Sequence, residues 1–251
     1  MQSATVTAFA DGRVVAMNPA ALGGALGPQA GSHGEVFRQR ASVCEYKTAD
    51  LASVADQLEN LNTDSTERFA GRLDLARLGA LGHSFGGNAA LELCRTDQRC
   101  RAAANLDGAL WTDVGTVGLD GPALQILAEH GEFAVTSEDA VKAGVAPNVE
   151  WFEAEKAITF GGWRKVQQRA QPGYTVQVSG ASHISFMDVP FLPVTDASIV
   201  KPALDATKIQ PDRMWRITCD LLLAFFAKHL NGAAAPLLDR PADDYPELIV
   251  G

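Results

Sequence analysis

The sequence is short of basic residues and of long apolar runs. Lys and Arg number 21 against 30 Asp and Glu, and the net charge is −9, so the chain is not expected to bind nucleic acid or an anionic membrane surface electrostatically. The densest apolar run, Leu221 to Ala227, has seven residues, whereas a membrane-spanning helix needs about 18 or more. We therefore predict no nucleic-acid partner and no membrane span.

Cysteines are also few, and their spacing excludes a common class of metal site. The four cysteines, Cys44, Cys94, Cys100 and Cys219, show no CxxC pattern and no histidine at zinc-finger distance, so no metal site is expected. Cys94 and Cys100 are six residues apart and can form a local disulfide in an oxidising compartment. The residues from Met1 to Thr5 lack the basic and apolar regions of a secretory signal, so no export signal is predicted in the chain as given.

The chain does have enough apolar material for a sizeable core. Of its 251 residues, 47% are hydrophobic and 20% are charged, which disfavours disorder. No linker or internal repeat is visible, so residues 1–251 are expected to form one domain. Segments that favour strands alternate with segments that favour helices, and this alternation predicts an α/β fold with a mostly parallel sheet.

The first predicted elements are a hairpin and a helix. Residues 4–9 and 13–17 favour strands and flank the turn signal Asp11-Gly12, which predicts a β-hairpin. Residues 19–34 are rich in Gly, Ala and Pro, so they are expected to form a loop. A helix is expected over residues 50–61, where apolar residues recur at helical spacing.

The later elements are predicted to alternate between strand and helix. Strands are expected over residues 75–81, 102–106, 123–128 and 174–178, and helices over 88–94 and 163–169. Asp212 is expected to cap a long final helix that ends at Asn231-Gly232 and buries Trp215, Leu222, Phe226 and Leu230. Residues 130–157 are expected to form a variable, cap-like insertion.

One short segment has the pattern of a nucleophile elbow. Gly82-His83-Ser84-Phe85-Gly86 matches GxSxG, in which a tight turn between a strand and a helix presents a serine at the carboxyl edge of the sheet. The pattern is frequent by chance, but here a predicted strand precedes it and a predicted helix follows. Both flanking glycines are expected to be required, because a side chain there would collide with the neighbouring strand and helix. Ser84 is therefore the predicted nucleophile, with a solvated serine in a glycine-rich turn as the alternative.

A serine nucleophile needs a histidine base, and the base needs a carboxylate to orient it. His183 is the predicted base, because the loop 180–186 directly follows the last predicted strand, where an α/β-hydrolase places its histidine. The other histidines have different expected settings: His33 in the loop, His83 inside the elbow, His130 after a strand and His229 at the end of the last helix.

The residues alone leave the acid open between two strand ends. Asp107 follows the predicted strand 102–106 and precedes a glycine, whereas Glu129 and Glu132 follow the next strand. Spacing favours Asp107 only slightly, so both strand ends stay candidates on this ground.

Several segments together resemble the bacterial platelet-activating-factor acetylhydrolase-like branch of the α/β-hydrolases. The resemblance is carried by residues 69–75, 82–87, 105–110 and 180–188, and it extends to 9–15, 225–230 and 236–238. It implies an α/β-hydrolase-like three-layer sandwich. In that family the acid follows the strand directly after the elbow helix, so the resemblance selects Asp107.

The resemblance also implies that family members carry further residues before the hairpin, including the first strands of the sheet. An oxyanion hole needs the backbone N–H of the residue after the nucleophile, Phe85, and a second N–H from an early strand-to-helix loop. His33-Gly34 resembles such a donor loop, but no apolar strand precedes it. We therefore expect a sheet that is incomplete on its N-terminal side. Its strand 75–81 would expose an edge through which two copies can pair, unless the first hairpin covers it.

No metal or organic cofactor is expected, because acyl transfer through a serine requires neither. Phe85, Trp111 and Phe186 are expected to line an apolar acyl pocket, and Trp151 or Trp163 can line it or belong to the core. The resemblance implies a serine carboxylic-ester hydrolase for short-acyl, acetyl-like esters, including esters of phospholipid type, and a location outside the cell or in its envelope. The alternative is a non-catalytic hydrolase remnant that binds hydrophobic ligands or partners.

Overall fold

The computed structural model describes residues 6–8, 12–16, 32–130, 133–188, 191 and 207–251. Its main sheet has five strands in the order β3 (Leu78–His83), β4 (Cys100–Leu106), β5 (Ala123–Leu127), β6 (Gly173–Val178) and β7 (Leu248–Val250). The strands β3 to β6 are parallel, and β7 pairs antiparallel with β6. The mostly parallel sheet predicted from the sequence is confirmed, and β7 is an addition that the sequence analysis missed.

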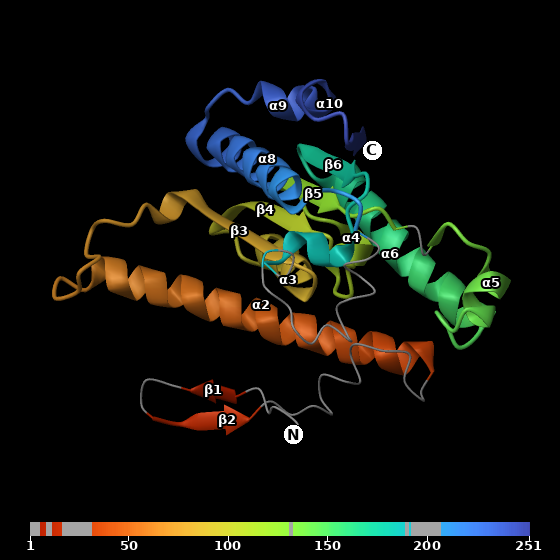
Figure 1. Cartoon of the computed structure of the whole chain (residues 1–251). Helices are drawn as coiled ribbons and strands as arrows, with labels where there is room; N and C mark the ends of the chain where they lie inside the picture. The colour runs from red at the N-terminus through yellow and green to blue at the C-terminus, as the bar shows by residue number, and fades with distance from the viewer. Residues whose placement is uncertain (1–5, 9–11, 17–31, 131–132, 189–190, 192–206) are drawn as a thin grey trace.

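Helices cover both faces of this sheet (Figure 1). On one face lies α8 (Pro211–Asn231), and on the other lie α3 (Phe85–Thr96) and α6 (Val149–Arg169). Residues of β5 pack against both helical layers. Leu124 and Ile126 pack with α8, whereas Ala123 and Leu127 pack with α3 and α6. Successive side chains of a strand point to opposite faces, so a strand covered on both sides is apolar throughout.

Further helices and 3₁₀ turns of the described residues surround this core. They are α2 (His33–Thr63), α4 (Val114–Val117), α5 (Ser137–Lys142), α9 (Pro236–Asp239) and α10 (Pro241–Asp244), with the 3₁₀ turns η1 (Leu75–Arg77) and η3 (His183–Phe186). The helix α2 runs alongside α3 on the outside of the molecule (Figure 1). The Cys94–Cys100 disulfide joins the end of α3 to the start of β4, which is the local pairing that the cysteine spacing allowed.

The helix α2 begins at His33, long before the predicted start at residue 50. Its first turn has a capping box, in which the Glu35 side chain accepts a hydrogen bond from the Ser32 backbone N–H at 2.8 Å. The Ser32-x-x-Glu35 spacing is a sequence signal for a helix start. The part of α2 before residue 50 has few buried residues, however, so it shows no clear apolar stripe. The predicted loop is therefore wrong at residues 33–34, and its residues 19–31 lie outside the described part of the chain.

The predicted N-terminal hairpin is present as β1 (Val6–Ala8) and β2 (Val14–Ala16), which pair antiparallel. Residues 9–11, with half of the expected turn, lie outside the described ranges. The hairpin forms a separate two-stranded sheet. Among the described strands β3 pairs with β4 alone, so the described hairpin strands do not cover the β3 edge.

Two predicted boundaries are displaced by local capping. The strand expected from residue 75 begins at Leu78, because the Asp74 side chain accepts a hydrogen bond from the Ala76 N–H and turns residues 75–77 into η1. The helix expected near 163–169 begins at Val149, where the Asn148 side chain accepts from the Trp151 N–H at 2.8 Å. With α5, this makes much of the segment 130–157 helical.

The final helix has the expected length, but its buried stripe is one position earlier than predicted. Met214, Ile217, Leu221 and Phe225 are buried, whereas Trp215 is 63% exposed. Leu222, Phe226 and Leu230 are half-buried beside this stripe. The run 221–227 is apolar on every side, so spacing alone does not distinguish two neighbouring stripes. Gln210, not Asp212, is the N-cap, and Gly232 ends the helix in the left-handed conformation as predicted.

Candidate active site

The turn between β3 and α3 places Ser84 in a strained backbone conformation. Its φ is 59° and its ψ is −127°, as expected for the nucleophile of an elbow, and its N–H donates to the Leu106 carbonyl at 3.0 Å. A Cβ at Gly82 would lie 2.2 Å from the carbonyl carbon of Gly86, so only glycine fits at position 82. The crossing of β3 over the start of α3 therefore depends on this residue.

The second glycine that the turn requires is Gly87, not Gly86 as the pattern predicted. A Cβ built at Gly86 has no atom within 4 Å, whereas one at Gly87 would lie 2.0 Å from Oδ1 of Asn105. Asn105 is buried and holds the turn after β4, where it accepts from the Gly108 N–H and donates to the Gly108 carbonyl, both at 2.8 Å. The sequence analysis missed Asn105, because a buried amide in a strand has no periodic signal.

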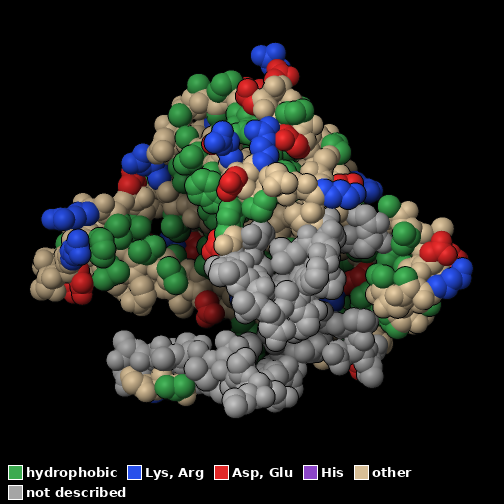
Figure 2. All heavy atoms as spheres, in the orientation of Figure 1, with side chains coloured by type: hydrophobic (Ala, Val, Ile, Leu, Met, Phe, Trp, Pro, Cys, Tyr) green, Lys and Arg blue, Asp and Glu red, His purple; other side chains and the backbone are tan. Residues whose placement is uncertain are grey.

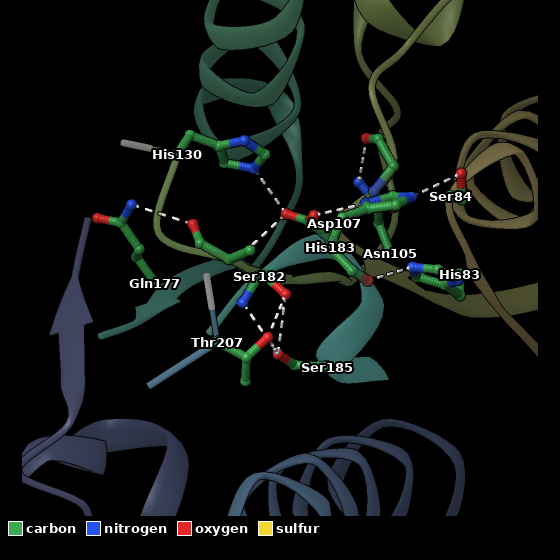
Figure 3. Close-up of polar contacts among 12 residues, drawn as sticks. His83, Ser84, Asn105, Asp107, His130, Gln177, Ser182, His183, Ser185 and Thr207 are labelled. Atoms are coloured by element: carbon green, nitrogen blue, oxygen red, sulfur yellow. Dashed lines mark hydrogen bonds and ion pairs between the residues drawn. The ribbon is translucent and has the colours of Figure 1, made fainter. Parts of the chain in front are cut away.

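The structure brings the three predicted catalytic side chains into one hydrogen-bonded chain (Figure 3). Nε2 of His183 lies 3.1 Å from Oγ of Ser84, and Nδ1 of His183 lies 2.7 Å from Oδ2 of Asp107. Ser84 follows β3, Asp107 follows β4, and His183 begins η3 beyond β6. These strands are parallel, so their carboxyl ends meet at one edge of the sheet.

The charge on Asp107 fixes the proton positions along this chain. Its side chain is fully buried, which alone would raise its pKa, but hydrogen bonds from His130, His183 and the Ala128 N–H lower the pKa to about 2. An ionised carboxylate only accepts hydrogen bonds, so Nδ1 of His183 carries a hydrogen. Nε2 of the neutral ring is then free to accept the Ser84 hydroxyl proton.

The other acid candidates hold different places. The Glu129 carboxylate accepts from the Gly180 N–H at 2.7 Å and so ties the end of β5 to the loop after β6. Glu132 lies outside the described residues. The structure thus places Asp107, and not Glu129, against His183.

Two further histidines contact the site, and the sequence analysis gave neither of them a role. Nε2 of His130 lies 2.8 Å from Oδ1 of Asp107. His83 donates from Nε2 to the His183 carbonyl at 2.9 Å, and its ring centroid lies 4.4 Å from that of His183. Burial lowers the pKa of His83 to about 4, so this ring is neutral near pH 7. The available signal for His130 was its place shortly after the end of β5.

A cavity of about 250 Å³ opens over the three side chains. Its lining includes Phe85 and Trp111, as predicted, together with Arg40, Ala109, Phe133, Thr159 and Trp163. Trp163 donates from Nε1 to the Gly108 carbonyl at 2.8 Å. The Arg40 guanidinium lies 4.6 Å from the Trp111 ring centroid and pairs with Glu155. Phe and Trp rings therefore form part of the cavity wall near Ser84.

The segment that carries Trp111 is held in place by α3. Oδ1 of the buried Asn88 accepts from the Trp111 N–H at 2.6 Å, and the Glu92 carboxylate accepts from the Val114 N–H at 2.9 Å. The Glu92 side chain also pairs with Arg95. These bonds hold this wall of the cavity against the helix that begins at the elbow.

Three residues considered for the site lie elsewhere. Phe186 stacks on His83 at a centroid distance of 5.8 Å, outside the lining of this cavity. Trp151 belongs to a small apolar cluster with Phe152. His33 begins α2, and its ring lies 5.5 Å from that of Trp151. Phe85 is the first residue of α3, so its N–H belongs to the helix end, where backbone N–H groups have no partner within the helix.

The sheet, the elbow and the residues at the strand ends define an α/β hydrolase. The fold is shared with the solved structure of a ferulic acid esterase from Streptomyces cinnamoneus, with a TM-score of 0.67 and 24% identity over 98% of this chain and 62% of that one. Residues 49–235, well over half of the chain, match the family described as platelet-activating factor acetylhydrolase, isoform II. The chain belongs to this family, which confirms the resemblance seen in the sequence.

Two curated relatives carry names of esterases or related hydrolases. A probable 1-alkyl-2-acetylglycerophosphocholine esterase of Arthroderma benhamiae is 28% identical over 187 residues, which cover 69% of this chain and 43% of the relative. A bis(hydroxyethyl) terephthalate hydrolase of Streptomyces coelicolor is 39% identical over 71 residues, or 25% of this chain and 23% of the relative. The matched part of this chain spans less than half the length of each relative.

Proposed function

We propose that this chain is a serine carboxylic-ester hydrolase that cleaves short-acyl, acetyl-like esters through an acyl-enzyme on Ser84. The observation that carries the proposal is the hydrogen-bonded chain from Ser84 through His183 to the buried Asp107. The family match and the esterase names of the relatives support the same class of reaction.

The first half of the proposed reaction forms the acyl-enzyme. Nε2 of His183 takes the proton of the Ser84 hydroxyl while Oγ attacks the ester carbonyl carbon. The imidazolium then gives this proton to the leaving alcohol oxygen, and the ionised Asp107 stabilises the imidazolium meanwhile. The N–H of Phe85, at the positive end of the α3 dipole, is the proposed donor to the oxyanion.

The second half uses water in place of the alcohol. His183 takes a proton from the water, the resulting hydroxide attacks the acyl carbon, and the Ser84 oxygen leaves with the proton from His183. Each half returns the imidazole to its neutral form. The residues described here require no cofactor for either step.

The size and the lining of the cavity support the proposal that a small acyl group binds among apolar side chains. A volume of about 250 Å³ lies below the range of about 300–1,000 Å³ of pockets for drug-sized ligands. Trp111 and Phe85 would contact the acyl group, and the proposed substrates include an acetyl ester of phospholipid type. Phe133 also lines the cavity, which supports the proposal that residues 130–157 act as a cap within a single domain 1–251.

The test is hydrolysis of p-nitrophenyl acetate by the wild-type chain and by Ser84→Ala. Loss of the nucleophile is expected to lower kcat by about 10⁴-fold or more, because the other groups of the site act through this oxygen. Ser137→Ala is the matched control, since Ser137 lies on α5 and bonds to Glu153, away from the cavity. Equal rates for wild type and Ser84→Ala would refute the proposal, and no turnover by the wild type would favour the non-catalytic remnant.

A further inference from the structure

The acid of the proposed site binds two histidines, and the reaction described above uses only one of them. Oδ2 of Asp107 faces His183, whereas Oδ1 accepts from the Ala128 N–H at 2.7 Å and lies 2.8 Å from Nε2 of His130 (Figure 3). The carboxylate therefore has donors on both oxygens. His130 lies in the segment after β5, whereas Ser84 follows β3 and Asp107 follows β4.

The direction of the His130 bond follows from the charge of its partner. An ionised carboxylate has no hydrogen to give, so Nε2 of His130 donates to Oδ1. Three donors then hydrogen-bond to a carboxylate that is buried away from water. These bonds compensate the cost of burying its charge. They also fix the rotation of the carboxylate plane, because donors contact both of its oxygens: the Ala128 N–H and His130 at Oδ1, and His183 at Oδ2.

The backbone at Asp107 makes such support necessary. Its φ is 54°, a conformation that residues other than glycine rarely adopt, and the following Gly108 passes so close to Ser84 that a Cβ there would lie 2.2 Å from the Ser84 carbonyl oxygen. The chain thus turns sharply where it presents the acid. A small rotation of this side chain would move Oδ2 away from His183.

We propose that His130 is a positioning residue: its Nε2–H fixes Oδ1 of Asp107, so that Oδ2 stays directed at Nδ1 of His183. The proposal rests on the proposed ester hydrolase. A displacement of about 1 Å at a reacting group can cost about 10²-fold in rate, so loss of this donor is expected to lower kcat by about 10- to 100-fold and to leave KM nearly unchanged.

His130 also packs against aromatic rings, and this contact gives a competing explanation. Its ring centroid lies 5.0 Å from that of Trp163 and 6.0 Å from that of Phe133. A role in packing would need the flat ring, whereas a role in positioning needs the N–H. Three substitutions separate the two: Phe keeps a ring without the donor, Gln keeps a donor without the ring, and Met matches Gln in length but has neither.

The experiment measures kcat and KM for p-nitrophenyl acetate in His130→Phe, His130→Gln and His130→Met. We expect low kcat in the Phe and Met variants and a rate near wild type in His130→Gln. The same three changes at His229, which contacts Tyr174 and Phe225 near the end of α8, are the matched controls. Normal rates in all three His130 variants, equal losses in all three, or a loss confined to His130→Gln would each overturn the proposal.

A second measurement does not depend on activity. The proton between Nδ1 of His183 and Asp107 is expected to give a downfield ¹H NMR resonance, assigned by its loss in His183→Ala. It should persist in His130→Gln and shift or exchange away in His130→Met. A resonance unchanged in His130→Met would refute the positioning role, whereas failure of Ser84-dependent turnover with the expected NMR pattern would refute the hydrolase and leave the positioning intact.

Discussion

At the scale of single residues, the site is organised by one buried charge and the imidazoles around it. Asp107 is held ionised by the donors of His183, His130 and Ala128, and His83 supports His183 from the other side through its backbone carbonyl. Burial of the His83 ring disfavours a positive charge on it, which lowers the pKa of His83. Its protonation state is therefore linked to the stability of the fold.

The pH dependence of stability is expected to show this link. The pKa of His83 is lowered to about 4 from 6.5, chiefly by burial, so between these values the unfolded chain binds a proton that the folded chain does not. Stability should therefore be highest above pH 6.5 and fall as the pH is lowered towards 4. Urea unfolding at several pH values should show a smaller fall for His83→Gln, and identical pH profiles for the two proteins would contradict this account.

The catalytic residues could be predicted from the sequence because each of them lies at or after a strand end, next to a local sequence pattern. GxSxG fixed Ser84, and the loop after the last strand fixed His183, whereas Asp107 needed the family resemblance as well. His130 and His83 were seen but received no role, because their partners are brought near only by the pairing of strands far apart in sequence. Asn105 had no pattern that a single sequence could show.

At the scale of elements, the turn from β3 to α3 gives a matched pair of substitutions. Gly82→Ala would force a Cβ to within 2.2 Å of the Gly86 backbone, whereas a Cβ at Gly86 has free space. We expect Gly82→Ala to lower the free energy of unfolding by about 1–3 kcal/mol or more. For Gly86→Ala we expect no loss, or a gain below about 1 kcal/mol from helix propensity.

Chemical denaturation of the two variants measures this difference. Circular dichroism should first show that both variants are folded, and the midpoints can then be compared with the wild type. If Gly86→Ala were the more destabilised of the two, the elbow would not cross as the structure describes it. The GxSxG pattern alone cannot make this distinction, because it treats both glycines alike.

Element boundaries were less predictable than element types. The helix α2 was placed too late because its first half has few buried residues. The helix α6 was placed too late because its first buried residues, Trp151 and Phe152, pack in a small cluster apart from the main core. In both cases a cap marks the true start, at Ser32 for α2 and at Asn148 for α6. The apolar stripe of α8 was misplaced by one residue because the tertiary contacts choose between two equally apolar faces.

At the scale of the whole molecule, the main sheet ends at β3, which has one neighbour among the strands that the structure describes. Among the described strands β3 pairs only with β4, and Leu81 on it is 51% exposed. An apolar groove of about 700 Å³ runs between this edge and α8, with Leu222 and Phe226 in its lining. Figure 2 shows hydrophobic side chains gathered on this face over α8 and toward β3. Within the described residues, no helix is long and apolar enough to cross a membrane.

Because β3 lies at the edge of the described sheet, we still predict that two copies of the chain associate through it. An unpaired strand offers backbone donors and acceptors to a second copy, and a lysine on an edge strand opposes such pairing. We expect sedimentation velocity to show a mass that rises with concentration for the wild type and less so for Leu81→Lys. Val54→Lys is the control, because Val54 is exposed on α2, away from the edge. A monomer at all concentrations would contradict the prediction.

The most direct test of the proposed hydrolase is covalent labelling with a fluorophosphonate, followed by peptide mass spectrometry. Such a reagent reacts with a serine whose proton a neighbouring base can take. The account predicts one adduct, on the peptide that contains Ser84, which is absent from Ser84→Ala and formed much more slowly in His183→Ala. An unlabelled wild-type chain, or an adduct that forms equally well without His183, would contradict it.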